Sequence, residues 1–160
     1  MDIKKTAYHE AGHAVAAYRF GHYVDEITII KKDDILGSSK SETEWGGNIK
    51  SYIEQIIVLY AGFAAERKYN VKANKRGSIN DDEHATVLLR FTNEKETSLR
   101  KKAKEIINKN WIIIEAIAEK LIEYKTLKAD EWVIIIDCFD EGEENWEECF
   151  FKLKNFNFIY

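Results

Sequence analysis

The chain has no proline among its 160 residues, and this absence constrains its fold more than any other feature. Proline interrupts helices because it lacks one backbone hydrogen bond and its ring clashes with the preceding turn. Without it, the long stretches rich in Lys, Glu, Ile and Leu can continue as helices, and helix ends must be sought at glycines and small polar clusters. The sequence therefore predicts a mainly helical protein.

Apolar spacing and helix-end signals predict where the elements lie. The expected helices cover residues 3–20, 49–69, 80–91 and 94–124, with a short one opening near Lys128. Gly21 would end the first helix. Residues 26–32 are rich in β-branched side chains and predict a strand, with residues 35–39 pairing as an edge. The expected fold class is mainly α with a small β-sheet (α+β).

The size of the chain fits one domain, because 160 residues with 45% apolar composition can build one core. We expect residues 1–138 to form this domain and residues 139–160, acidic and then aromatic, to be an appendage of it. The net charge of -4, with lysines scattered among acidic residues, argues against nucleic-acid binding. Cys138 and Cys149 lack zinc-knuckle or redox spacing, which favours unpaired thiols, with a disulfide between them as the alternative. No apolar run could span a bilayer, so we expect a soluble cytoplasmic protein.

His9, Glu10 and His13 form an HExxH pattern within the first expected helix. A spacing of four residues puts both imidazoles on one face, one turn apart, where they can bind one metal ion. Zinc suits two histidine nitrogens, a third protein ligand and an open water position. Glu10 follows the first histidine, so its carboxylate is placed to take a proton from that water. The motif predicts a zinc-dependent hydrolase with Glu10 as the catalytic base.

The helix around the motif is almost uncharged. From Thr6 to Tyr18, the only strongly polar residues besides Thr6 are His9, Glu10 and His13. Such a helix is buried on nearly all sides. A buried carboxylate and two buried histidines are costly unless they are paired or bound to a metal. The alternative interpretation is a pair of hydrogen-bonded core histidines with a salt-bridged glutamate.

The third metal ligand does not follow from the motif. The metzincin pattern requires Gly and His where this chain has Ala16 and Arg19, so that class is excluded. The candidates further along the chain are His22, Glu66, Asp81, Asp82 and His84. Helical periodicity does not choose among Asp81, Asp82 and His84, because each has apolar residues on its own helical stripe.

Several segments together carry a family resemblance. They are TAYHEAGHAV (6–15), ITII (27–30), IVLYAGFAAE (57–66), GSIND (77–81) with Ala85 and Thr86, and LIE with TL (121–127). In this order they resemble the peptidase domain of FtsH, the ATP-dependent membrane zinc metalloprotease. Residues 6–15 resemble the zinc helix of the family, residues 57–66 its "GGRAAE" helix and residues 77–81 its "TGASND" segment. The resemblance extends over residues 3–136.

The resemblance implies roles for particular residues. Asp81 would be the third zinc ligand, since it occupies the Asp of the Asn-Asp pair in the family. Glu66 would lie near the site and orient a histidine, with an ordinary salt bridge as the alternative. Gly37-Ser38-Ser39 takes the place of the family's edge strand, which pairs with an extended substrate; a surface loop is the alternative. The departures from the family pattern, which leave substrate preference open, are Ala61, Phe63 and Arg76.

The implied function is a zinc-dependent endopeptidase that hydrolyses peptide bonds in unfolded or flexible polypeptide. Zn²⁺ would be held by His9, His13 and Asp81, with Glu10 as general base. The 160 residues contain no ATPase module, so a separate ATPase or adaptor would deliver substrate, and ring assembly in the family implies a homo-oligomer. The alternatives are a site-specific regulatory zinc protease and a non-catalytic zinc- or peptide-binding module. The intact Glu10 argues against a peptide-binding decoy.

Overall fold

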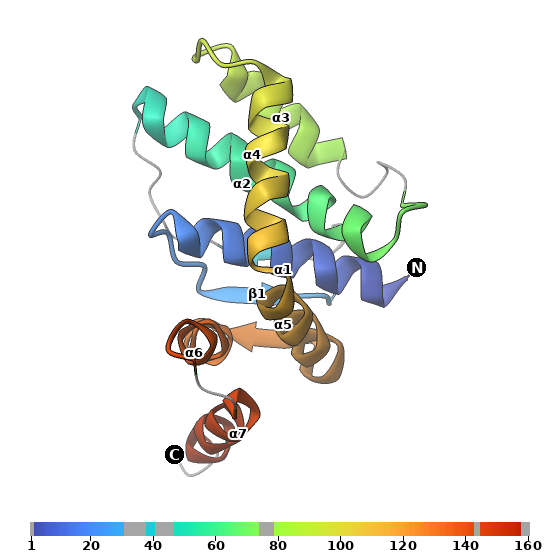
Figure 1. Ribbon diagram of the computed structural model, residues 1–160, viewed down its shortest axis with the longest axis vertical. Helices are drawn as coiled ribbons and strands as arrows, with labels where there is room; N and C mark the ends of the chain where they lie inside the picture. The colour runs from blue at the N-terminus through green and yellow to red at the C-terminus, as the bar shows by residue number, and fades with distance from the viewer. Residues whose placement is uncertain (1, 31–37, 41–46, 74–78, 143–144, 158–160) are drawn as a thin grey trace.

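The computed structural model describes residues 2–30, 38–40, 47–73, 79–142 and 145–157. Its elements are α1 (Ile3–Arg19), β1 (Glu26–Thr28), β2 (Ser38–Lys40), α2 (Ile49–Tyr69), α3 (Ile79–Leu89), α4 (Glu96–Lys109), α5 (Trp111–Tyr124), β3 (Thr126–Lys128), α6 (Ala129–Asp140) and α7 (Trp146–Asn157). The mainly helical α+β class expected from the sequence is confirmed (Figure 1). In the part of the chain that is described, no helix has both the length and the apolar character needed to cross a bilayer.

The helix α1 lies at the centre of the fold, between α2 on one side and β1 with α5 on the other (Figure 1). It begins after Asp2, whose side chain accepts a hydrogen bond from the Lys4 backbone N–H at 3.2 Å. It ends just before Gly21, which adopts the left-handed φ of 79° typical of a glycine after a helix. Every residue from Ala7 to Ala17 is buried, which confirms the burial on all sides expected from the uncharged sequence.

The helices α1 and α2 approach closely at Gly12. A Cβ atom there would lie 2.7 Å from the Cβ of Ala65 and 2.9 Å from the carbonyl oxygen of Ala61. These distances are too short for any side chain, so the close approach requires glycine on α1. As a result, the backbone of α2 lies directly beside the face of α1 that carries His9 and His13.

The single helix predicted over residues 94–124 is wrong, because the structure contains α4 and α5 with a break at Asn110. The Asn110 Nδ2 donates to the carbonyl oxygen of Ile106 at 2.8 Å, and Arg19 Nε donates to Asn110 Oδ1 at 2.8 Å. A side-chain amide that competes for a helix carbonyl favours the end of a helix. The break allows α4 to pack against α2 while α5 packs against α1 (Figure 1).

The described strands form one antiparallel sheet in the order β2-β1-β3, with Ile27 of β1 opposite Ser39 and Leu127. The strand predicted over 26–32 ends at Thr28, and the predicted edge over 35–39 is observed as Ser38–Lys40; residues 31–37 lie outside the described part. No pattern in the sequence predicts β3, because its three residues are too few to show periodicity. β2 is an edge strand and contacts α1.

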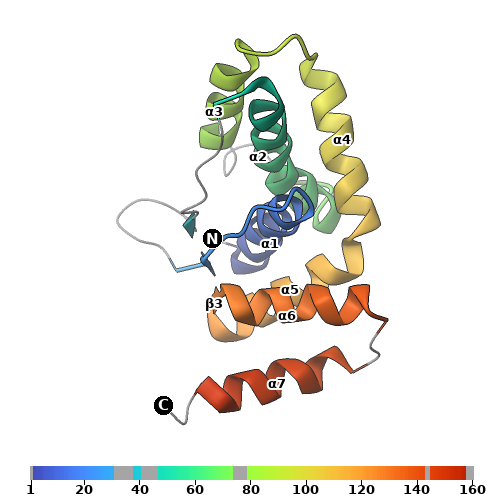
Figure 2. The same cartoon turned by 90° about the vertical axis from the view of Figure 1, so that its left-hand side faces the viewer.

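The C-terminal segment forms a helix that packs on the rest of the chain. α6 opens after Lys128, as predicted, and α7 packs against α6 (Figure 2). Phe150 of α7 is fully buried beside the ring of Tyr124, with 5.6 Å between ring centroids. Lys154 Nζ lies 2.5 Å from Glu131 Oε1 in an ion pair that holds α7 to the start of α6. Cys138 and Cys149, both described, form no disulfide.

Candidate metal centre

The two histidines of the HExxH motif lie at the interface between α1 and α2. Because His9 and His13 are one helical turn apart, their rings meet, and the two Nε2 atoms are 3.0 Å apart. Their residues are 7% and 8% exposed, and Glu10 is 5% exposed. Three polar side chains that are usually exposed to solvent are therefore buried in the interior of the protein.

Asp81 joins the two histidines from the first turn of α3. Its Oδ2 lies 3.0 Å from His9 Nε2 and 3.5 Å from His13 Nε2. One donor atom from each of the three side chains lies within 4.8 Å of the others. The structure therefore brings together the three residues that the sequence and the family resemblance singled out, in a group that could hold a metal ion.

Three of the other candidates for the third ligand are engaged or placed elsewhere. Asp82 accepts a hydrogen bond from Arg100 Nη2 at 2.7 Å. His84 is exposed on α3 and is not part of the group. His22 lies after the end of α1, with its Nε2 3.4 Å from Glu54 Oε2. Helix α3 presents neighbouring side chains in different directions, which is why only Asp81 of its polar residues reaches the histidines.

The hydrogen bond of His13 fixes the state of its ring. Its Nδ1 lies 2.8 Å from the carbonyl oxygen of Val58, which can only accept, so Nδ1–H donates. In a neutral imidazole the Nε2 then carries a lone pair. That lone pair faces His9 Nε2 and the Asp81 carboxylate. Electron-rich atoms gathered in this way repel one another unless a cation or a proton lies between them.

The spacing of these atoms fits a tetrahedral divalent metal. Zinc bonds of about 2.0–2.1 Å at tetrahedral angles hold two donor atoms roughly 3.3 Å apart. The observed separations of 3.0, 3.0 and 3.5 Å among His9 Nε2, His13 Nε2 and Asp81 Oδ2 bracket this value. Two imidazoles and one carboxylate also form the type of donor set found in catalytic zinc sites. The residues present therefore fit a zinc ion.

Glu66 lies on the other side of the His9 ring. Its Oε2 is 3.4 Å from His9 Nδ1, a longer separation than the usual 2.7–3.2 Å of an N–H···O hydrogen bond. Glu66 is 7% exposed, and no described residue satisfies His9 Nδ1 with good hydrogen-bond geometry. This position beside a histidine is the one that the family resemblance implied for Glu66.

The close packing of charges changes the acidity of the group. Burial lowers the pKa of His9, but the carboxylates of Asp81, Glu66 and Glu10 outweigh burial and raise that pKa to about 10. Burial raises the pKa of Asp81, but the adjacent His13 and His9 rings outweigh burial and hold that pKa well below its usual range. The pKa of Glu10 is raised, chiefly by burial, although the nearby histidines oppose the shift. The site thus gathers two buried histidines and the carboxylates of Glu10, Glu66 and Asp81, and the charge of each group affects the acidity of the others.

Two features of α2 that support the site were not singled out from the sequence. One is the Val58 carbonyl that holds His13. The other is Gly62, where a Cβ would lie 2.6 Å from Cε1 and 2.9 Å from Cδ2 of the His13 ring. A backbone carbonyl leaves no trace in the sequence. An isolated glycine inside an apolar helical pattern was the available signal for Gly62.

Comparison with known proteins agrees with this geometry. No protein-family model matches the chain. It is 36% identical over 92 residues to the ATP-dependent zinc metalloprotease FtsH 1 of Rhodopirellula baltica, and 38% identical over 95 residues to FtsH of Thermus thermophilus. These matches cover 54% and 56% of this chain but only 14% and 15% of the relatives. The chain is therefore a partial homologue of the FtsH zinc metalloproteases, corresponding to a small part of their length.

Proposed function

We propose that this protein is a zinc-dependent endopeptidase that hydrolyses peptide bonds in unfolded or flexible polypeptide. The observation that carries the proposal is the convergence of His9, His13 and Asp81 within 4.8 Å beside the buried Glu10. Glu10 directly follows a metal-ligand candidate, which is the arrangement that HExxH hydrolysis requires. The homology to FtsH metalloproteases supports the same chemistry.

Each residue has a distinct role in the proposed reaction. His9, His13 and Asp81 would hold the zinc ion, which when bound supplies a Lewis acid for water activation and carbonyl polarisation. Glu10 would accept the proton of the attacking water and deliver it to the leaving amine. Val58 holds His13 through its carbonyl oxygen, so the ring stays oriented while the proton moves. Glu66 would orient His9 in the same way from the opposite side of that ring.

The edge strand β2 supports a binding mode for an extended substrate. β2 is paired with β1 on one side and no described strand pairs with the other side. Because β2 also contacts α1, a substrate strand added there would run beside the helix that carries the site. Relatives that match this chain are named ATP-dependent, and we include in the proposal a separate ATPase or adaptor that delivers the polypeptide.

The test is cleavage of an unfolded protein such as casein by the zinc-loaded chain, with zinc content measured alongside. Glu10→Gln should keep the metal and lose activity by about 100-fold or more, because it removes the proton acceptor alone. Asp81→Asn should lower both zinc content and activity. Activity that persists in Glu10→Gln would overturn the mechanism.

A non-catalytic zinc- or peptide-binding module gives a different outcome in the same experiment. Such a module would retain stoichiometric zinc in the wild type and cut nothing, with or without Glu10. A site-specific regulatory protease would leave casein intact but cut one partner protein at a single position, and Glu10→Gln would abolish that cut. The paired measurement of zinc and cleavage separates these functions.

A further inference from the structure

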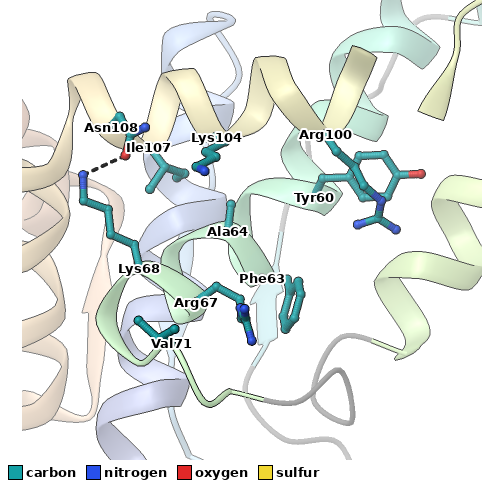
Figure 3. Close-up of a pocket in the computed structure, with 10 residues that line it drawn as sticks. All are labelled: Tyr60, Phe63, Ala64, Arg67, Lys68, Val71, Arg100, Lys104, Ile107 and Asn108. Carbon is teal, nitrogen blue, oxygen red and sulfur yellow. Dashed lines mark hydrogen bonds between the residues drawn. The ribbon is translucent and has the colours of Figure 1, made fainter. Parts of the chain in front are cut away.

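A second surface of the protein has features of a binding site. Helices α2 and α4 enclose a groove of about 610 Å³, which we call the α2–α4 groove (Figure 3). Its basic side chains are Arg67 and Lys68 of α2 and Arg100 and Lys104 of α4. None of the residues that line it is acidic. The whole chain carries a net charge of -4, so this concentration of positive charge is local.

Three of these four cations lack an acidic partner among the described residues. Arg100 is compensated, with Asp82 and Glu96 carboxylates both 2.7 Å from its guanidinium. Arg67 donates instead to the carbonyl oxygen of Ala73 at 3.1 Å, and Lys68 to Asn108 Oδ1 at 2.8 Å (Figure 3). Lys104 is exposed and forms no ion pair with a described carboxylate. Within the described part of the chain, the groove therefore presents three cations that no carboxylate neutralises.

Apolar side chains accompany these charges. Phe63 and Ala64 of α2 are half-buried in the groove, and Ile107 of α4 is almost fully buried at its base. Val71, just beyond α2, is 74% exposed at the rim. Figure 3 shows side chains of α2 and α4 facing one another across this space. A ligand that combines negative charge with an apolar group would match both properties.

The α2–α4 groove is separate from the metal centre. Successive helix residues are rotated by about 100°, so Val58, Gly62 and Glu66 form one face of α2. That face contacts the histidines of α1. Phe63 and Arg67 line the groove together with residues of α4, and the groove has neither His9 nor His13 in its lining. A molecule in the groove would thus bind without entering the site where hydrolysis is proposed.

We propose that the α2–α4 groove docks an acidic segment of a partner protein, with an apolar side chain of that segment resting on Phe63 and Val71. The argument is charge complementarity: acidic side chains would pair with Arg67, Lys68 and Lys104. A short segment suits a groove about 610 Å³ in volume. The inference stands apart from the proposed function, since it holds whether or not the protein cuts peptide bonds.

The test uses a fluorescein-labelled 12-residue peptide with glutamates on both sides of a central Leu-Leu pair. Binding is followed by fluorescence anisotropy with the Glu10→Gln variant, so that no peptide is cut. Saturable binding that weakens as salt is added is expected, because exposed charges are screened. A peptide in which every glutamate is replaced by glutamine should bind at least about tenfold more weakly.

Matched charge reversals locate the binding surface. Arg67→Glu with Lys104→Glu should weaken binding by about tenfold or more, since two attractions become repulsions. Lys4→Glu with Lys101→Glu makes the same change of net charge at exposed positions that do not line the groove and should have less than about a twofold effect. Lys104→Ala alone, at an exposed position, should weaken binding in the same direction and provides a milder test.

Three results would overturn the proposal. They are equal binding of the glutamine peptide, equal weakening by both double variants, and no saturable binding. Sedimentation velocity distinguishes another occupant: self-association that is lost in the Arg67→Glu, Lys104→Glu variant, without peptide binding, would assign the groove to a second copy of the chain.

Discussion

At the scale of single residues, the candidate metal centre depends on Gly62, which has no side chain. Gly62 lies on α2 directly against the His13 ring, and a Cβ there would come within 2.6 Å of Cε1. The ring can occupy this place because glycine leaves the helix backbone bare. The same ring is fixed by its hydrogen bond to Val58. Position 62 therefore determines where the His13 Nε2 atom lies.

Gly62→Ala should weaken zinc binding by about tenfold or more while the fold persists. The added methyl group meets the ring of a side chain and not a backbone atom, so we expect the ring to be displaced at the cost of its hydrogen bond to Val58 while the helix stays in place. Zinc affinity is measured by competition with a chromogenic chelator, and folding by circular dichroism. Gly47→Ala is the matched control, since the described atom nearest to its added Cβ would be Tyr52 Oη, in ordinary contact at 3.8 Å. Unchanged affinity in Gly62→Ala would contradict this role.

At the scale of the elements, the site is assembled where α3 meets α1, and α3 is held by α4. Arg100 of α4 pairs with Asp82, the residue next to Asp81, at 2.7 Å. It also stacks over the Tyr60 ring, with its Cζ 3.9 Å from the centroid. This contact ties the first turn of α3 to the α2–α4 pair. The position of Asp81 therefore depends on a residue that does not touch the histidines.

Arg100→Leu should lower zinc affinity about three- to tenfold, because a partly exposed ion pair of this kind contributes about 1 kcal/mol and each 1.4 kcal/mol is tenfold in affinity. The chelator competition assay measures the change. Lys101→Leu is the control on the same helix, since the Lys101 side chain is 80% exposed and its Nζ lies 4.0 Å from Glu105 Oε1, too far for a strong ion pair. An equal effect of the two substitutions would show that Arg100 does not position α3.

At the scale of the whole molecule, the candidate ligands join two distant parts of the chain. His9 and His13 come from α1, and Asp81 comes from α3, 72 residues after His9. A metal ion bound by all three would hold these helices together only in the folded state. Binding would therefore add to the free energy of unfolding in proportion to the logarithm of metal concentration.

Removing zinc with a chelator should lower the melting temperature of the wild type. At a free zinc concentration of 100 times Kd, the bound ion adds about 2.7 kcal/mol to the free energy of unfolding. Glu10→Gln should keep this stabilisation, and His9→Ala should lose it, in differential scanning fluorimetry with and without the chelator. A shift that survives in His9→Ala would show that zinc binds elsewhere.

The sequence by itself determined the parts of this protein whose signals are local. Continuous helical spacing predicted the observed bounds of α2, and the nearly uncharged sequence around the HExxH motif predicted the burial of α1. The His9–His13 pair followed from the helical repeat alone. For Asp81 local periodicity left the choice open, and the family resemblance indicated the residue that the structure brings to the histidines.

Only the tertiary structure decided the features that depend on contacts between distant residues. The break at Asn110 involves Arg19 on α1, 91 residues away, so helical periodicity across 94–124 gave no warning of it. β3 exists because Thr126–Lys128 pairs with Glu26–Thr28, a contact that three residues cannot encode locally. Burial of Phe150 and the closeness of Gly62 to His13 likewise arise from packing. Local patterns record which face of an element is apolar, but not which other element will cover it.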